Sequence, residues 1–250
     1  MRHLIPLLVA PLILLAFVLP FTPMAKSAGP TIVIPPGTID PTTIPKWVNQ
    51  LDGPPPVWMP DSQTYDDDMT LVSEQYTITM KGHMQQILPT GYPMTPQWGY
   101  SGNARDAVTG QSIGYISNSP GASFEATRHV TNYVKYVNEV TTDHMFAVDP
   151  TLHWSNPNNM EMPMPPFLPY PPGYAEAQSN VPLVPHLHGG EVQSTFDGGP
   201  TAWWTATGVH GPGYSTLSST EANAAVYEYP NNQPATTLWY HDHALGLTRT

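Results

Sequence analysis

The alternation of hydrophobic and polar residues along this chain predicts short β-strands. Tyr76, Ile78 and Met80 occupy every second position of segment 74–87, which is the period of a strand buried on one face. Four other segments have β-forming residues at strand-like spacing, namely 124–140, 181–186, 225–229 and 235–241. The Gly-, Ser- and Asn-rich stretch that follows Trp98-Gly99-Tyr100 and ends at Ser119-Pro120-Gly121 predicts a loop. Without an amphipathic helix of useful length, the chain is expected to be an all-β sandwich or barrel.

The content of proline and glycine supports this fold class. The 250 residues include 31 prolines and 19 glycines, which disfavour long helices and favour short strands joined by long loops. Residues 28–65, with Pro54-Pro55-Pro56, are expected to form an extended arm. The domain proper is then expected over residues 66–250.

The N-terminus has the pattern of a secretion signal. A short polar start precedes the apolar run 4–21, and small and polar residues follow up to Ala28. The alternative is a retained anchor, but Pro6, Pro11 and Pro20 interrupt the run, and about 20 smooth apolar residues are needed for a span. We therefore expect residues 1–27 to be a cleaved signal peptide, and the mature protein to be secreted, periplasmic or on the cell surface, with no membrane segment.

Net charge and the absence of cysteine exclude several function classes. Loss of residues 1–27 removes Arg2 and Lys26 and no acidic residue, so 6 basic residues face 19 acidic ones, a formal net charge of −13. Nucleic acids and anionic membranes attract basic surfaces, so neither is an expected partner. The chain has no cysteine, which excludes a zinc-thiolate site, an iron–sulfur cluster and a blue-copper site within it.

Two His-x-His pairs are the strongest chemical signal in the sequence. His186 and His188 form one pair, His241 and His243 form the other, and 52 residues (189–240) lie between them. In a strand both imidazoles of such a pair point to the same face. Two adjacent strands would therefore aim four imidazoles into one volume, which suits copper, zinc, iron or nickel.

The residues around these pairs resemble the first cupredoxin domain of multicopper oxidases. The matching segments, in chain order, are Ile44-Pro45-Lys46-Trp47-Val48, Trp98-Gly99-Tyr100-Ser101-Gly102, Ser119-Pro120-Gly121, His186-Leu187-His188-Gly189-Gly190, Asp197-Gly198, Tyr229-Pro230-Asn231 and Leu238-Trp239-Tyr240-His241-Asp242-His243-Ala244. The subgroup they resemble is the bacterial spore-coat laccase and bilirubin-oxidase type. The resemblance implies a cupredoxin-like Greek-key β-sandwich or barrel with long Pro-rich loops, here incomplete at the C-terminus.

The resemblance also implies roles for individual residues. His186 corresponds to a ligand of the type 2 copper, and His188, His241 and His243 correspond to ligands of the type 3 copper pair. In such enzymes these coppers form a trinuclear cluster that reduces dioxygen to water. Asp197 corresponds to a carboxylate beside the cluster, which implies a proton-relay role. Asp242 lies between two ligand candidates and is expected to face the opposite side of its strand.

The sequence departs from the family pattern where the remaining copper ligands are expected. The family supplies further cluster ligands and the type 1 copper site from C-terminal cupredoxin domains, and none of those motifs occurs in this chain. The implied partners are therefore these missing domains, dioxygen and a small reducing substrate. That substrate would be a phenol, a related aromatic compound or a metal ion.

Two other functions remain as alternatives. A non-catalytic exported copper-binding module is favoured by Met160, Met162 and Met164, because thioethers select Cu(I), although methionine is also a common packing residue. A binuclear zinc hydrolase is disfavoured, because Gly189-Gly190-Glu191 follows the first pair where Asp and His are needed. The unpaired histidines are interpreted as structural: His83, His129, His144, His153 and His210.

The lack of cysteine generates a direct prediction. The purified 250-residue chain mixed with Cu(II) should develop no intense blue absorption band and should oxidise no phenolic compound, because both require a Cys–copper bond. Visible spectroscopy and oxygen-uptake measurements test this. Oxygen-coupled phenol oxidation that persists after trace metals and contaminating enzymes are removed would contradict it.

Overall fold

The computed structural model describes residues 38–51, 53–150, 152–160, 174–218 and 221–247, so the predicted signal peptide and two of the loop methionines lie outside the described residues. The chain divides into two units, residues 1–44 and 45–250. The described part of the first unit contains the 3-10 turn η1 (Pro41–Thr43), and the carboxylate of Asp40 caps it by accepting the Thr42 N–H. None of the helices described is long and apolar enough to cross a membrane.

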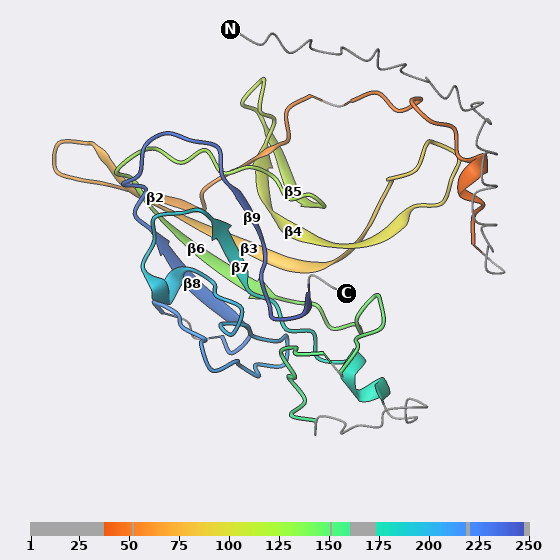
Figure 1. Cartoon of the computed structure of the whole chain (residues 1–250). Helices are drawn as coiled ribbons and strands as arrows, with labels where there is room; N and C mark the ends of the chain where they lie inside the picture. Colours follow the sequence, from red (N-terminus) through yellow and green to blue (C-terminus); the bar gives the residue numbers. More distant parts are fainter. Residues whose placement is uncertain (1–37, 52, 151, 161–173, 219–220, 248–250) are drawn as a thin grey trace, which may run out of the picture. The chain divides into compact units, whose positions relative to one another are not determined.

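Seven strands of the second unit form one sheet in the order β1-β4-β3-β6-β8, with β2 paired to β3 and β5 paired to β4 (Figure 1). The strands are β1 (Val57–Trp58), β2 (Ser62–Tyr65), β3 (Leu71–Gln85), β4 (Thr95–Arg105), β5 (Ser112–Asn118), β6 (Thr131–Asn138) and β8 (Ala224–Tyr229). β3 and β6 pair in parallel, whereas the other neighbours pair antiparallel. The predicted all-β class is confirmed.

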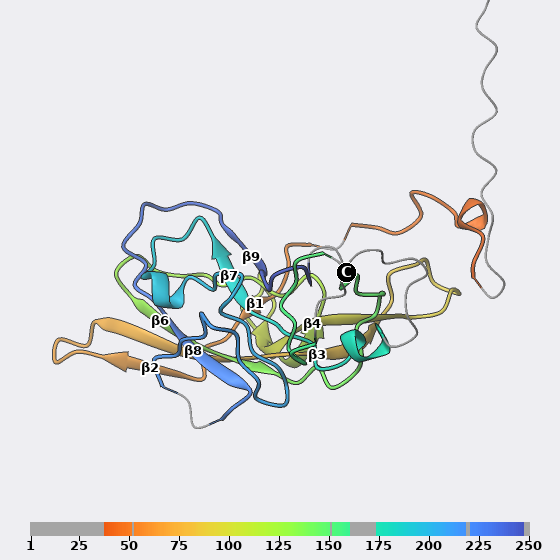
Figure 2. The same ribbon diagram turned by 60° about the horizontal axis from the view of Figure 1, so that its bottom comes forward.

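A two-stranded antiparallel ribbon, β7 (Pro185–His188) with β9 (Trp239–Asp242), forms a separate layer over this sheet (Figure 2). The ring of Tyr240 packs edge-on against Tyr100 and Phe124, with ring centroids 4.9 and 5.5 Å apart. Its hydroxyl accepts a hydrogen bond from Trp58 Nε1 at 3.1 Å and donates one to the Ala122 carbonyl at 2.6 Å. These contacts fix the ribbon to the sheet. Two further 3-10 turns are η2 (Tyr174–Gln178) and η3 (Ser194–Phe196).

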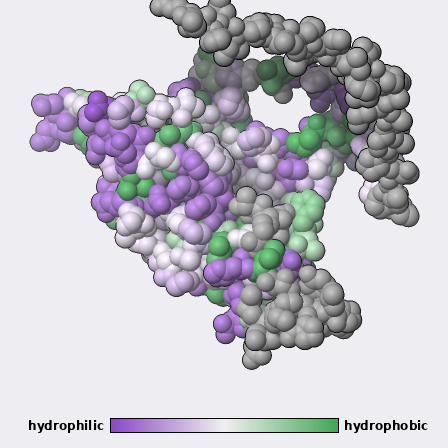
Figure 3. Space-filling model, viewed as in Figure 1, coloured by the Kyte–Doolittle hydropathy of each residue, from purple (hydrophilic) through white to green (hydrophobic). Residues whose placement is uncertain are grey.

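The main core lies between the sheet and the ribbon. Tyr76, Ile78 and Met80 of β3 are buried, as their spacing predicts, and they share a cluster with Val134 of β6 and Tyr227 of β8. Strand β2, at the opposite extreme, is exposed along its whole length. Polar side chains accordingly cover the β2 end of the sheet on the face shown in Figure 3.

The prediction of a loop after Tyr100 is wrong, because β4 continues to Arg105 and residues 112–118 form β5. Glycine in this strand serves packing. A Cβ on Gly102 would come within 3.1 Å of the Ile78 side chain and 3.3 Å of the Trp58 ring. Gly102, one of the small residues that indicated a loop, therefore makes room for two large neighbours.

Other strand boundaries also differ from the predictions. The strand expected over 124–140 begins only at Thr131, and Phe124 instead packs on Tyr76 from a loop. The strands expected from 181 and 235 begin at Pro185 and Trp239. Residues 57–65, placed in the extended arm by their sequence, contribute β1 and β2 to the sheet, and Trp58 is 2% exposed.

The turn after η3 packs tightly against β7 through Gly198. This residue has a φ of +69°, and a Cβ on it would overlap the carbonyl oxygen of Pro185 and lie 2.9 Å from its carbonyl carbon. Only glycine meets both the conformational and the steric requirement at this position. The neighbouring Gly199 has nothing within 4 Å of the equivalent Cβ.

Gly198→Ala should therefore lower the free energy of unfolding by at least about 2 kcal/mol, because a side chain at positive φ is strained and this one also meets backbone. Urea unfolding followed by circular dichroism measures the effect. Gly199→Ala is the matched control and should change stability much less. Equal stability of the two variants would contradict this description of the turn.

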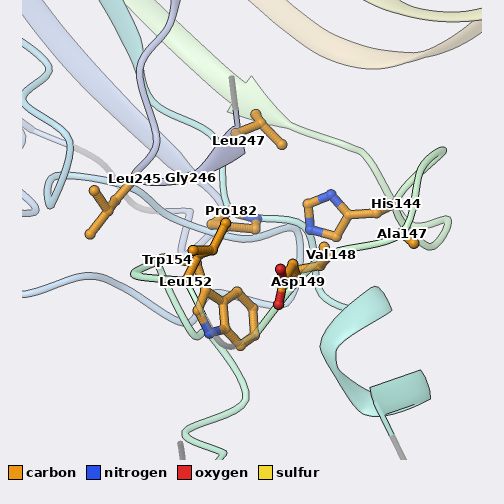
Figure 4. A pocket seen from close by; sticks show the side chains of 10 residues that line it. All are labelled: His144, Ala147, Val148, Asp149, Leu152, Trp154, Pro182, Leu245, Gly246 and Leu247. Carbon is orange, nitrogen blue, oxygen red and sulfur yellow. The ribbon is translucent and has the colours of Figure 1, made fainter. Parts of the chain in front are cut away.

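A second, smaller cluster contains Val148, Trp154 and Ala177, with Met160 packed against it. Beside it is a pocket of about 140 Å³ that is lined by Trp154 and the half-buried His144 (Figure 4). Neither ring nitrogen of His144 has a hydrogen-bond partner among the described residues. Burial lowers the pKa of His144, and the nearby Asp143 carboxylate opposes this shift.

The lowered pKa predicts a pH-dependent stability. In the unfolded chain His144 is protonated below the ordinary histidine pKa of about 6.5, whereas in the folded chain it stays neutral to a lower pH. The free energy of unfolding should therefore fall as the pH is lowered from 7 toward 5. His144→Phe should weaken this dependence, since phenylalanine does not titrate. His129→Phe, at an exposed position, should leave it unchanged. Unfolding curves across this pH range give the measurement, and identical slopes for wild type and His144→Phe would refute the prediction.

Candidate metal centre

The two His-x-His segments are the two strands of the ribbon. In its register His186 lies opposite His241, and His188 lies opposite Trp239. The N–H of His243 donates to the Val184 carbonyl at 2.9 Å, which continues the antiparallel contact beyond β9. Because side chains alternate along a strand, this pairing brings both pairs to one face.

The four imidazoles gather in a small volume. The ring centroid of His186 is 5.7 Å from that of His188, 5.5 Å from that of His241 and 4.7 Å from that of His243. The His188 Nδ1 and His241 Nε2 atoms are 3.4 Å apart. Ligand atoms of His186, His188 and His241 all lie within 4.8 Å of one another. Three of the sequence-predicted residues thus form one candidate metal group, with His243 stacked beside it.

Backbone carbonyls set the orientation of three of the rings. The Nδ1 atom of His186 lies 2.5 Å from the Asp197 carbonyl oxygen, that of His241 lies 2.6 Å from the Asp242 carbonyl oxygen, and that of His243 lies 3.3 Å from the Gly198 carbonyl oxygen. A carbonyl only accepts, so each Nδ1 carries the proton. The lone pair of each Nε2 atom is therefore left for a metal.

The local environment favours the neutral form of His241. Burial lowers the pKa of His241, and the three neighbouring imidazoles lower it further. A histidine with a lowered pKa is uncharged at neutral pH, which is the form that binds metals.

Asp242 faces the other side of the ribbon, as its position between two histidines predicts. Its Oδ2 accepts the Val184 N–H at 2.8 Å, and its Oδ1 accepts the Ala244 N–H at 3.0 Å. Burial raises the pKa of this carboxyl to about 7, against the effect of both hydrogen bonds. These hydrogen bonds hold the backbone around His241 and His243 in position.

Asp197 contacts the cluster mainly through its backbone. Its Oδ1 is 3.6 Å from His186 Nδ1, whereas its carbonyl oxygen makes the short contact to the same atom. The side chain is 44% exposed, so its carboxylate is open to solvent beside the histidines.

Trp239 is a residue of the centre that the sequence analysis did not identify. Its ring stacks on His241 at 4.0 Å with an interplanar angle of 18°, and on His188 at 4.9 Å with an angle of 26°. The available signal was its place opposite His188 in the register, which requires knowledge of the strand pairing. Trp239 limits the orientations that these two rings can take.

The single histidines and the described loop methionine have local contacts. His83 bonds Gln85, His129 bonds Asn232, and His210 bonds the Ala222 carbonyl. Met160 packs on the second cluster, in agreement with its packing interpretation. Met162 and Met164 lie outside the described residues.

Comparison with known proteins identifies the family. No protein-family model matches the chain. It is 30% identical to a laccase of Bacillus subtilis (strain 168) over 211 residues, which are 83% of this chain and 31% of the relative. It is also 30% identical to a laccase of Haloferax volcanii over 208 residues, which are 83% of this chain and 29% of the relative. It is 31% identical to multicopper oxidase LPR1 homolog 1 of Oryza sativa subsp. japonica over 192 residues, which are 75% of this chain and 28% of the relative.

The chain thus spans less than a third of the length of these curated relatives. The chain also matches a crystal structure of a laccase from Pediococcus acidilactici, over 78% of this chain and 27% of the laccase chain. The sequence identity is 19% and the TM-score is 0.41, so this match does not by itself identify the fold. The sequence matches carry the assignment, because they extend over most of the chain and share the names laccase or multicopper oxidase. This chain belongs to the multicopper oxidase family and contains a cupredoxin-type domain of it.

Proposed function

We propose that this domain supplies four imidazole ligands to the copper centre of an exported, laccase-like oxidase. In the longer protein that the relatives' lengths indicate, further cupredoxin domains supply the remaining ligands. The whole protein would oxidise phenols, related aromatic compounds or metal ions, and would reduce dioxygen to water. The observation that carries this proposal is the pairing of His186 with His241, which unites the two His-x-His motifs.

The residues present fit copper. Three of the donors have Nδ1 atoms that face backbone carbonyls, which leaves Nε2 as the ligand atom, and imidazole suits copper well. Ligand atoms of His186, His188 and His241 are within 4.8 Å of one another. We assign His186 to the type 2 copper, and His188, His241 and His243 to the type 3 pair, on the family resemblance.

Copper held there would pass electrons from the reducing substrate to dioxygen. The chain's own contribution is orientation. The carbonyls of Asp197, Asp242 and Gly198 hold three Nδ1–H groups, and such outer contacts make the ligands more basic and fix their direction.

Reduction of dioxygen to water also consumes protons. The carboxylate of Asp197 is partly solvent-exposed and lies 3.6 Å from His186, which supports a role in passing protons between bulk water and the centre. We therefore propose Asp197 as the proton-relay residue of this half of the site.

The copper proposal predicts a specific loss of binding. The metal-free chain should bind Cu(II) through the paired histidines, and the double variant His186→Ala with His241→Ala should bind more than about tenfold more weakly, since it loses one ligand from each strand. Isothermal titration calorimetry supplies the affinities, and electron paramagnetic resonance reports nitrogen ligation.

The matched control is His129→Ala with His153→Ala, which removes two exposed histidines outside the ribbon. This variant should bind Cu(II) like wild type. If both double variants gave the wild-type binding curve, the assignment of the ribbon as the copper site would fail.

A further inference from the structure

The layer between the ribbon and the sheet contains a large cleft on the side of β7 and β9 that faces away from the histidines. Its volume is about 560 Å³, and Leu187, Trp239 and Tyr240 line it from the ribbon. Leu187 and Tyr240 alternate with the candidate ligands, which places them on the opposite face of their strands. Trp239 lies on the histidine face and stacks on His188 and His241. The cleft therefore lies mainly behind the candidate metal centre and borders it at Trp239.

The floor of the cleft is one face of β6. Asn132, Val134 and Tyr136 occupy alternate positions of that strand and all line the cleft. They are 3%, 2% and 2% exposed, so the floor is deeply buried. Tyr229, opposite Asn132 in the register, extends the floor onto β8.

An unpartnered polar group points to a ligand. The Oδ1 atom of Asn132 is buried and accepts no hydrogen bond from any described residue. A buried polar atom left without a partner costs about 1–3 kcal/mol, so a bound donor would be favoured there. The neighbouring Tyr136 hydroxyl makes only a long contact, 3.5 Å from the Tyr229 hydroxyl.

The walls favour a flat and neutral molecule. Phe124 and Tyr240 pack edge-on at 5.5 Å and both line the cleft, so they offer aromatic surface to a third ring. The one charged side chain among the lining residues is Arg128, which is exposed. A charged group at the floor would lack a counter-charge, which opposes its burial.

The size is that of a small-molecule site. Binding pockets span about 300–1,000 Å³, are mainly apolar and hold a few oriented polar groups. We propose that this cleft binds a small neutral aromatic molecule that carries one O–H or N–H donor, with the donor directed at Asn132 and the ring against Phe124 and Tyr240. The proposal concerns binding alone and does not depend on copper.

Phenol and anisole are suitable probes, because they have similar size and differ in the single hydrogen-bond donor. The metal-free chain should bind phenol about tenfold more tightly than anisole, which corresponds to one buried hydrogen bond. Isothermal titration calorimetry compares the affinities. Nuclear Overhauser effects between phenol and the aromatic protons of Phe124 and Tyr240 locate the ligand.

Asn132→Leu should bind phenol and anisole equally, whereas Asn103→Leu, the same change at an exposed position of β4, should keep the tenfold preference. If Asn132→Leu fails to fold, the affinity ratio and the Overhauser contacts of the wild-type chain decide the matter. Equal affinities for phenol and anisole in wild type, Overhauser contacts elsewhere, or no phenol binding up to its solubility limit would each overturn the proposal. The last result would mean that water alone fills the cleft.

Discussion

The pairing of β7 with β9 is the constraint on which the candidate site depends. It joins two segments that are separated by 52 residues (189–240) and places His186 opposite His241. A shift of one residue in this register would turn one His pair to the wrong face, because side chains alternate along each strand. The ribbon has only four residues in each strand, and a two-stranded ribbon is marginally stable by itself.

The rest of the molecule supplies the missing stability through a few polar anchors. Tyr240 ties β9 to Trp58 and Ala122, which belong to distant parts of the chain. Asp242 ties the end of β9 to Val184, just before β7. Gly198 lets a turn approach β7 so closely that two consecutive carbonyls, those of Asp197 and Gly198, reach His186 and His243. The geometry of the imidazoles is thus set by backbone contacts from three directions.

The sequence predicts the chemistry of this site better than its surroundings. The His-x-His pairs are visible as motifs, and the strands β3 and β8 follow from alternation, because each buries one face of a regular strand. Strand β4 was missed because its glycines and small polar residues indicated a loop. The need for Gly102 to accommodate Trp58 and Ile78 arises only once the sheet is assembled. The contact of His243 with the Gly198 carbonyl and the stacking of Trp239 on His188 also depend on which distant segments meet. Local patterns contain no information about such long-range partners.

The alternation of side chains makes the β7–β9 ribbon a partition with a different environment on each surface. One surface presents imidazoles, and the other presents Leu187 and Tyr240 to the cleft. Since a strand cannot rotate or shift on one surface alone, any displacement of the ribbon changes both environments together. If a molecule bound on one surface displaces the ribbon and so changes the affinity of the other surface, thermodynamic linkage makes the factor the same in both directions. A backbone layer one strand thick thereby joins two sites that meet at the side chain of Trp239.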